Sequence, residues 1–151
     1  MTRSKKARSV TAACMMAGSA CVSAPPPRPT LKDCPPGTQG TYERFHLEGT
    51  NFLLIPPTLS VSPVEVREGE IHNVELGLPW GTLPEKTLFS GRLFFAKDQV
   101  YGLFTRAHLP GGEIVPICIE LTQNGPGTPM LKESTSKKVF ISASIGARLV
   151  R

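Results

Sequence analysis

The sequence lacks the residue spacings that mark metal sites and histidine-based catalysis. It has only three histidines, and neither a His-Glu-x-x-His motif nor a cluster of carboxylates accompanies them. No Cys-x-x-Cys pair and no combination of cysteine and histidine has the spacing of a zinc site. We therefore interpret His46, His72 and His108 as surface or hydrogen-bonded side chains, and we predict no metal and no other cofactor.

Motifs for covalent catalysis and for nucleotide binding are also missing. Ser90 and Ser144 lie outside the Gly-x-Ser-x-Gly frame of a nucleophile elbow. The turn at residues 125–127 is not followed by Lys-Ser or Lys-Thr, and Pro126 removes an amide donor that a phosphate loop would need. Nothing repeats at a fixed period, and residues 41–47 are only a weak helical candidate. The sequence therefore predicts no enzyme class.

What the chain does have is a distinctive N-terminal segment. A basic start at residues 1–8 precedes a short apolar run at residues 10–20, and small residues then lead into Cys21. This order is typical of a secretory signal whose cleavage exposes a cysteine for lipid attachment. The apolar run is too short to cross a bilayer, which needs about 20 apolar residues. We expect residues 1–20 to be a signal peptide and Cys21 to carry lipid.

Three details keep alternatives open. Lipoprotein signals usually have Leu, Val or Ile three residues before the cysteine, where this chain has Gly18. Cys14 fits the same role less well, because it would leave almost no hydrophobic run. Ordinary cleavage after Ala24 suits the small residues there, but it would place Pro25 directly after the cut. An unprocessed or organelle-targeting N-terminus is the remaining alternative.

Processing would remove most of the net positive charge. The sequence carries 17 Lys and Arg against 12 Asp and Glu, a net charge of +5. Residues 1–20 hold four of those cations and no acid, so a chain that begins at Cys21 has a net charge of +1. This balance gives little support for nucleic-acid binding, and we predict no nucleic-acid partner. The predicted partners are the membrane, through the N-terminal lipid, and an envelope protein.

The cysteine count predicts one disulfide. Cys14 lies in the apolar run and Cys21 is the candidate lipid carrier, which leaves Cys34 and Cys118. In an oxidising compartment two such thiols are expected to pair. The bond would pin the loose Cys-Pro-Pro-Gly stretch to an apolar run. The alternative is that Cys118 is a small buried hydrophobic residue and Cys34 is free.

The rest of the chain has the pattern of a single β domain. Residues 21–40 are rich in proline and are predicted to form a lipid-anchored tether, and residues 41–151 form the domain. Short β-branched or aromatic runs between turn residues predict its strands. The predicted strands are residues 52–55, 59–66, 71–76, 87–95, 100–107, 113–121, 138–144 and 147–150. We expect an all-β fold, a small antiparallel sandwich or partly open barrel of about seven short strands.

Polar residues of the central meander form a candidate binding patch. The members of this patch are Arg92, Tyr101, Arg106, His108 and Glu113. The alternative is that they are exposed side chains of a half-buried sheet that form ion pairs across strands. Trp80, in a loop between two turn-forming residues, is a further candidate, because loop aromatics make binding hot spots. A lone tryptophan is more often part of the core.

Several stretches resemble small predicted lipoproteins of myxobacteria. They are Asp-Cys-Pro-Pro-Gly at residues 33–37, Arg-Glu-Gly-Glu at 67–70, Trp-Gly at 80–81, Leu-Phe-Ser-Gly-Arg-Leu-Phe-Phe at 88–95, and Phe-Thr-Arg-Ala at 104–107 before Pro-Gly-Gly-Glu at 110–113. The resemblance covers most of the mature chain and implies its compartment and fold, but no catalytic residue. Some relatives carry a serine/threonine protein kinase label. This chain has no Gly-rich nucleotide loop, no His-Arg-Asp loop and no Asp-Phe-Gly motif.

These features together predict an exported, lipid-anchored envelope protein with a binding or structural role and no catalytic one. Val22 rather than Asp directly after Cys21 favours the outer membrane, with the domain facing the periplasm; a secreted or soluble periplasmic protein is the alternative. The alternative functions are an envelope hydrolase of unknown substrate and a regulatory module of a serine/threonine kinase pathway.

Overall fold

Strands account for most of the regular structure in the computed structural model, which describes residues 27–56 and 63–151. The predicted signal peptide, Cys21 and the first part of the strand predicted at residues 59–66 lie outside the described residues. In the described part of the chain, no helix has the length and apolar character needed to span a membrane.

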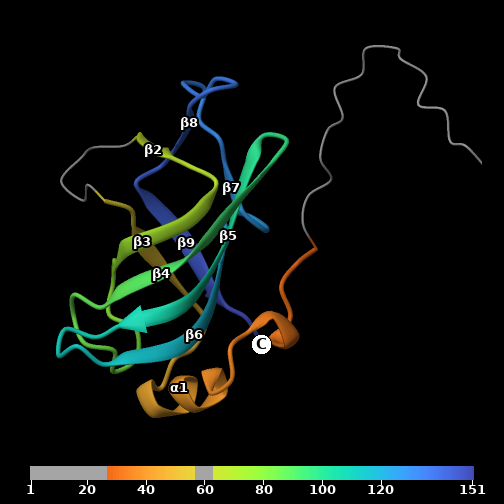
Figure 1. Ribbon diagram of the computed structural model, residues 1–151. Coiled ribbons are helices and arrows are strands. Elements are labelled where there is room, and N and C mark those ends of the chain that lie inside the picture. The colour runs from red at the N-terminus through yellow and green to blue at the C-terminus, as the bar shows by residue number, and fades with distance from the viewer. Residues whose placement is uncertain (1–26, 57–62) are drawn as a thin grey trace, which may run out of the picture.

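Six antiparallel strands close into a barrel (Figure 1). In chain order they are β1 (Thr50–Leu54), β3 (Gly69–Leu76), β4 (Leu88–Ala96), β5 (Gln99–His108), β6 (Ile114–Leu121) and β9 (Ser144–Leu149). Their order around the wall is β4-β3-β1-β9-β6-β5, and pairing of β5 with β4 completes the circle. The predicted small all-β fold is confirmed, and its barrel is closed.

The remaining elements lie at the edges of this barrel. The two-residue strand β7 (Thr128–Pro129) pairs with β5, and β2 (Val64–Val66) pairs with β8 (Val139–Ile141) as a separate two-stranded sheet. A 3-10 helix, η1 (Leu31–Asp33), and an α-helix, α1 (Thr38–Phe45), precede the strands. The C-terminus lies beside these two helices (Figure 1).

The alternation predicted for the central strand is confirmed. Val100, Gly102 and Phe104 of β5 are buried, whereas Tyr101 and Leu103 between them are partly exposed. Apolar residues that alternate along a strand point to one side of the sheet. The interior of the barrel is therefore filled by side chains such as Phe104, and it is a packed core.

Bulges bend the strands so that the barrel can close. Against β4, the adjacent residues Ser90 and Gly91 pair with Arg106 and Phe104, which leaves Thr105 of β5 as an extra residue. Against β6, the register shifts at the same place, but there the extra residue is on β6, between Pro116 and Ile119. Bulges of this kind increase local twist and curvature. A Cβ atom at Gly91 would lie 2.2 Å from the carbonyl oxygen of Leu103, so the strands can approach this closely only at a glycine.

Strand β6 is buried on both faces, which its sequence pattern did not predict. Its inner face carries the expected apolar residues, but Cys118 and Glu120 on the opposite face are buried as well. Helix α1 packs against β6 and covers part of that face. The helix begins at Thr38, before the predicted start at residue 41, because Gly37 adopts a left-handed conformation that turns the chain into it.

Two other local predictions differ from the structure. The loop expected at residues 124–129 is a tight turn followed by β7, since Gly127 donates a hydrogen bond to Leu121 and Thr122 Oγ1 donates one to Gly125. The strand expected at residues 138–144 ends at Ile141, as β8. The last strand, β9, begins at Ser144 and not at the predicted residue 147.

Candidate binding surface

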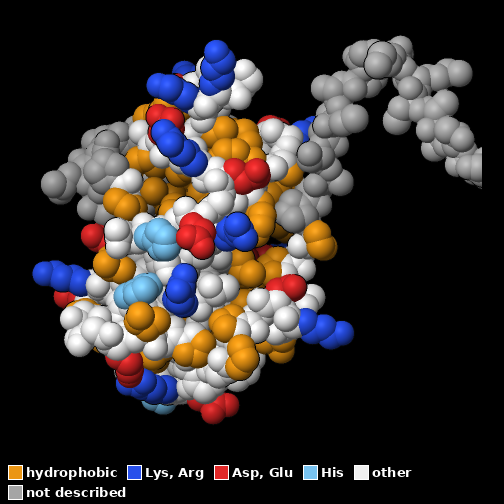
Figure 2. Space-filling view, in the orientation of Figure 1, with side chains coloured by type: hydrophobic (Ala, Val, Ile, Leu, Met, Phe, Trp, Pro, Cys, Tyr) orange, Lys and Arg blue, Asp and Glu red, His pale blue; other side chains and the backbone are white. Residues whose placement is uncertain are grey.

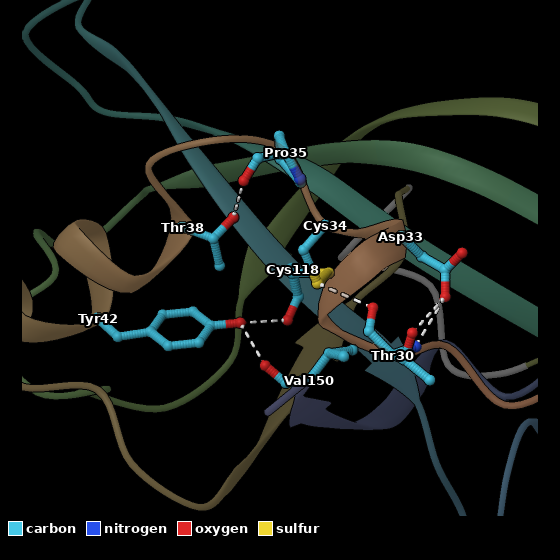
Figure 3. The surroundings of a disulfide bond; sticks show 8 residues. All are labelled: Thr30, Asp33, Cys34, Pro35, Thr38, Tyr42, Cys118 and Val150. Carbon is cyan, nitrogen blue, oxygen red and sulfur yellow. Dashed lines mark hydrogen bonds between the residues drawn. A yellow bond between two sulfur atoms is a disulfide. The ribbon is translucent and has the colours of Figure 1, made fainter.

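A disulfide joins the N-terminal arm, which we define as residues 27–37, to the barrel wall (Figure 3). It links Cys34 with Cys118 of β6, and their Cα atoms are 5.4 Å apart. The predicted disulfide is therefore confirmed, and the free-thiol alternative is wrong. The bond fastens the arm to the middle of a buried strand rather than to a flexible edge.

Local hydrogen bonds shape the arm on either side of the disulfide. Asp33 Oδ2 accepts hydrogen bonds from the backbone nitrogen of Thr30 at 2.7 Å and from its Oγ1 at 3.3 Å. Thr38 Oγ1 donates to the carbonyl oxygen of Pro35 at 2.7 Å, where α1 begins. Cys34 Sγ lies 3.6 Å from the carbonyl oxygen of Thr30, and since a disulfide sulfur carries no hydrogen, this is a packing contact (Figure 3).

Tyr42 of α1 ties the helix to β6 and to the C-terminus. Its hydroxyl lies 2.7 Å from the carbonyl oxygen of Cys118 and 3.1 Å from that of Val150, so its one hydrogen is shared between two buried acceptors (Figure 3). Burial raises the pKa of Tyr42 to about 12, against the smaller opposing effect of Arg151 and the two carbonyls. Three parts of the chain thus meet at one phenol group.

A buried carboxylate fastens the start of the arm. The side chain of Glu120 is only 3% exposed, and its Oε1 accepts a hydrogen bond from Arg28 Nε at 3.0 Å and another from Arg148 on the neighbouring strand. A carboxylate removed from water needs such partners, because desolvation of an unpaired charge costs several kcal/mol. Glu120 therefore favours a conformation in which Arg28 lies against β6.

A groove of about 410 Å³ lies between the arm and the outer wall of the barrel. The arm contributes Pro27 and Pro29, and the barrel contributes Phe94, Tyr101 and Leu103. Phe94 is 39% exposed. The turn at residues 126–127 also lines the groove, as do Glu120 and its partner Arg28. The groove is mainly apolar, with a paired charge set into it.

The structure places some residues of the predicted patch apart from the others. Tyr101 lines the groove. Glu113 accepts two hydrogen bonds from Arg44 of α1, at 2.7 and 2.9 Å, which lower the pKa of Glu113. Arg92 is exposed on β4 opposite Glu70 of β3. These three members thus belong to different settings. Only Glu113 among them forms an ion pair in the described residues, and its partner Arg44 lies on helix α1 rather than on a neighbouring strand.

Trp80 belongs to the core. Its side chain is 3% exposed, and its indole nitrogen donates a hydrogen bond to the carbonyl oxygen of Glu48 at 2.8 Å. A buried indole N–H generally needs such a partner. The single tryptophan therefore fixes the loop before β4 against the segment before β1, and it offers no surface to a ligand.

Arg106 and His108 lie on the outer face of β5. His108 Nε2 is 2.9 Å from Ser90 Oγ of β4, and Arg106 is opposite Ser90 in the register of the two strands. Figure 2 shows histidines among basic and acidic side chains on the face that carries β3, β4 and β5. Ser90 is only 1% exposed, so its hydroxyl is shielded from any substrate. The contact satisfies a buried hydroxyl group, as most buried polar groups require.

The other histidines are exposed at separate positions. His46 ends α1 in a left-handed conformation, and His72 Nε2 lies 3.7 Å from Glu70 Oε2 on β3. Among residues 27–56 and 63–151, no three His, Cys, Asp or Glu side chains are placed to hold a metal ion.

Sequence reasoning missed most of the groove. Phe94 and Leu103 alternate with core residues and so look like ordinary outward positions, and nothing in the sequence places the arm beside them. One signal was available: Glu120 is the only acid within the apolar run of β6, and an acid in such a strand usually has a specific partner. Comparisons with protein families, with characterised proteins and with solved structures give no significant match, so the function must be inferred from the geometry of these residues.

Proposed function

We propose that this chain is an exported, lipid-anchored protein of the cell envelope whose barrel binds a protein partner. The observation that carries the proposal is the Cys34–Cys118 disulfide. Disulfides form and persist in oxidising compartments and are rare in the cytosol of most organisms. Such a bond in a small β domain agrees with the secretory signal expected at residues 1–20 and with a position in the periplasm, at the outer membrane.

The way in which the arm is fastened supports a role at a membrane. Cys21, the expected lipid carrier, precedes Cys34 by 13 residues. The Arg28–Glu120 ion pair and the disulfide both hold the arm on β6. A lipid at Cys21 would therefore be coupled to a rigid wall of the barrel. A rigid link between the lipid and the barrel suits a structural or binding domain that is held at a membrane surface.

The groove beside the arm is the surface on which we expect the protein partner to bind. Exposed aromatic side chains in concave, mainly apolar surroundings are typical of the few residues that dominate binding energy at interfaces. Phe94 and Tyr101 have this setting, and Arg28 also lines the groove. We propose that apolar side chains of an envelope protein bind between these aromatic residues and the prolines of the arm.

The anchor is tested by replacing its cysteine. Cys21→Ala should move the protein from the membrane fraction to the soluble periplasmic fraction, while Cys14→Ala should leave its fractionation unchanged. Mass spectrometry of the wild-type protein should show an acylated N-terminal Cys21. An intact Met1 on the cellular protein, together with thiols at positions 34 and 118 that can be alkylated, would refute export and anchoring.

The groove is tested by site-specific photo-crosslinking in intact cells. A crosslinking residue at position 94 should give a discrete adduct with an envelope protein, which Leu103→Asp should abolish. The matched control is position 114, where Ile114 is exposed outside the groove. Equal adducts from positions 94 and 114 would contradict a binding role for the groove.

A further inference from the structure

A second hollow, of about 420 Å³, lies over β1, β9 and the turn that follows β6. No charged side chain lines it. Its lining carries one exposed aromatic ring and a set of hydroxyl and amide side chains. These residues are Thr50, Phe52, Gln123, Asn124, Ser142 and Ser144. Its volume falls in the range of about 300–1,000 Å³ that is usual for small-molecule sites.

A glycine is among the residues that line this hollow. Phe52 of β1 is paired with Gly146 of β9, so bare backbone lies beside the aromatic ring. A Cβ atom at Gly146 would lie 2.2 Å from the carbonyl oxygen of Thr122. An aromatic residue beside a glycine can cover exposed backbone in a sheet. Covering of the backbone at Gly146 explains why an aromatic residue stands at position 52. It does not explain the polar residues around the ring, and Phe52 is still 51% exposed.

The polar side chains around Phe52 have unused hydrogen-bonding capacity. Within the described residues, the side chains of Thr50, Asn124, Ser142 and Ser144 make no hydrogen bond. Gln123 Oε1 accepts a hydrogen bond from Thr128 Oγ1 at 2.8 Å, which fixes the amide and leaves its NH₂ group available as a donor. The hollow therefore presents several neutral groups that can both donate and accept hydrogen bonds.

The wall that carries Gln123 and Asn124 is held in place. Thr122 donates from its backbone nitrogen to Gly146 at 2.9 Å and from its Oγ1 to Gly125 at 2.8 Å. The backbone nitrogen of Gln123 also donates to Gly125, at 2.9 Å. A site whose groups are already positioned loses less entropy when a ligand binds.

We propose that this hollow is a binding site for a neutral carbohydrate. A pyranose ring has an apolar C–H face, which would pack on the ring of Phe52 and bury apolar surface there. Its hydroxyl groups both donate and accept hydrogen bonds, as do the side chains of Thr50, Ser142 and Ser144, and the amides of Gln123 and Asn124 offer both kinds of group. A charged ligand would find no counter-charge in the lining. The site does not depend on export or on the lipid anchor.

Direct titration with two neutral oligosaccharides tests the proposal. The protein would be the full chain carrying Cys14→Ser and Cys21→Ser, refolded with its disulfide formed, and the probes would be cellohexaose and chitohexaose. Calorimetry should show that at least one of them binds with a Kd of about 1 mM or tighter, while an oligogalacturonate of equal length binds more weakly by tenfold or more. Absence of binding to both neutral probes at about 10 mM would overturn the proposal.

Three variants locate the binding. Phe52→Ala should weaken binding of the neutral probe at least tenfold, which corresponds to about 1.4 kcal/mol. Ser144→Trp, at an exposed position, should fill the hollow and abolish binding. Ile114→Ala removes part of an exposed apolar side chain that lines neither hollow and should leave the affinity unchanged. An unchanged Kd in a folded Phe52→Ala variant, verified by its near-ultraviolet circular dichroism spectrum, would refute the assignment of this site.

Discussion

Loss of the Cys34–Cys118 disulfide should remove several kcal/mol from the free energy of unfolding. The change we consider is Cys34→Ser, because Cys34 is half-buried whereas Cys118 is fully buried and should stay in place as a hydrophobic side chain. Cys14→Ser and Cys21→Ser in both the variant and its parent leave no other thiol that could exchange.

The size of the effect follows from the length of chain that the bond closes. The two cysteines are separated by 84 positions, so the closed loop contains four of the six barrel strands and the first part of β6. Chain-entropy estimates for such a loop give about 4.6 kcal/mol at 25 °C. The hydrogen bonds of Tyr42 and the Arg28–Glu120 pair can still form after the change. We therefore expect a loss of about 3–4.6 kcal/mol that arises mainly in the unfolded state.

Urea denaturation followed by the fluorescence of Trp80 measures this loss. Trp80 is the only tryptophan and is buried in the core, so its emission reports global unfolding of the barrel. The m-value should rise in the variant, because an unfolded chain without the cross-link exposes more surface. Digestion with trypsin should also become faster after Lys32, which lies two residues before the disulfide.

A loss below about 1 kcal/mol would refute the reasoning, since a loop of this length cannot have so small an entropic effect in a chain that unfolds completely. Faster cleavage at Lys32 without any shift in the urea midpoint would show that the bond holds only the arm. In that case the disulfide would restrain a local segment, and the barrel would be stable without it.

Two further predictions concern the packing around the barrel. Tyr42→Phe should cost about 1–3 kcal/mol, because two buried carbonyl oxygens lose the hydroxyl between them. Burial raises the pKa of Tyr42 to about 12, so the contribution of Tyr42 to the free energy of unfolding is intact below pH 10 and should fall by about 1.4 kcal/mol per pH unit between pH 10 and 12. Urea titrations of the wild type at several alkaline pH values should show this slope. A similar slope in Tyr42→Phe would contradict the assignment to Tyr42. Gly91→Ala should lower the free energy of unfolding by about 1–3 kcal/mol or more, because the new methyl group would lie 2.2 Å from the carbonyl oxygen of Leu103. The control is Gly111→Ala, whose methyl group would meet no atom within 4 Å and which should leave the stability nearly unchanged. Equal melting temperatures of the two alanine variants would refute the close contact of β4 and β5 at Gly91.

The individual strands and the inner face of β5 were predictable because they depend on local patterns. Val100 and Phe104 alternate with less buried residues, and turn residues separate β4, β5 and β6 along the chain. Closure of the barrel was not predictable in this way. It depends on pairing of β1 with β9, whose residues are almost a hundred positions apart, and no local pattern specifies such a partner.

The two proposed sites differ in how far the sequence could indicate them. The groove forms where the arm, the outer face of β5 and the turn after β6 meet. The predicted patch did not correspond to this groove, because its members were chosen for being close together in the sequence. Phe52 and Gly146 gave only a weak indication of the second site. They are an aromatic residue and a glycine on β1 and β9, two strands with alternating burial. Only the register of β1 against β9 shows that they are neighbours.

Glu120 shows why the arm has to be considered part of the domain. A carboxylate at an apolar strand position would normally point to solvent, yet this one is buried beneath residues that were expected to form a loose tether. Because a buried charge without partners is costly, release of the arm would have to expose Glu120 to water or leave it with Arg148 alone. The disulfide makes that release rarer still. Any force applied at the N-terminus would therefore be transmitted through the arm to β6.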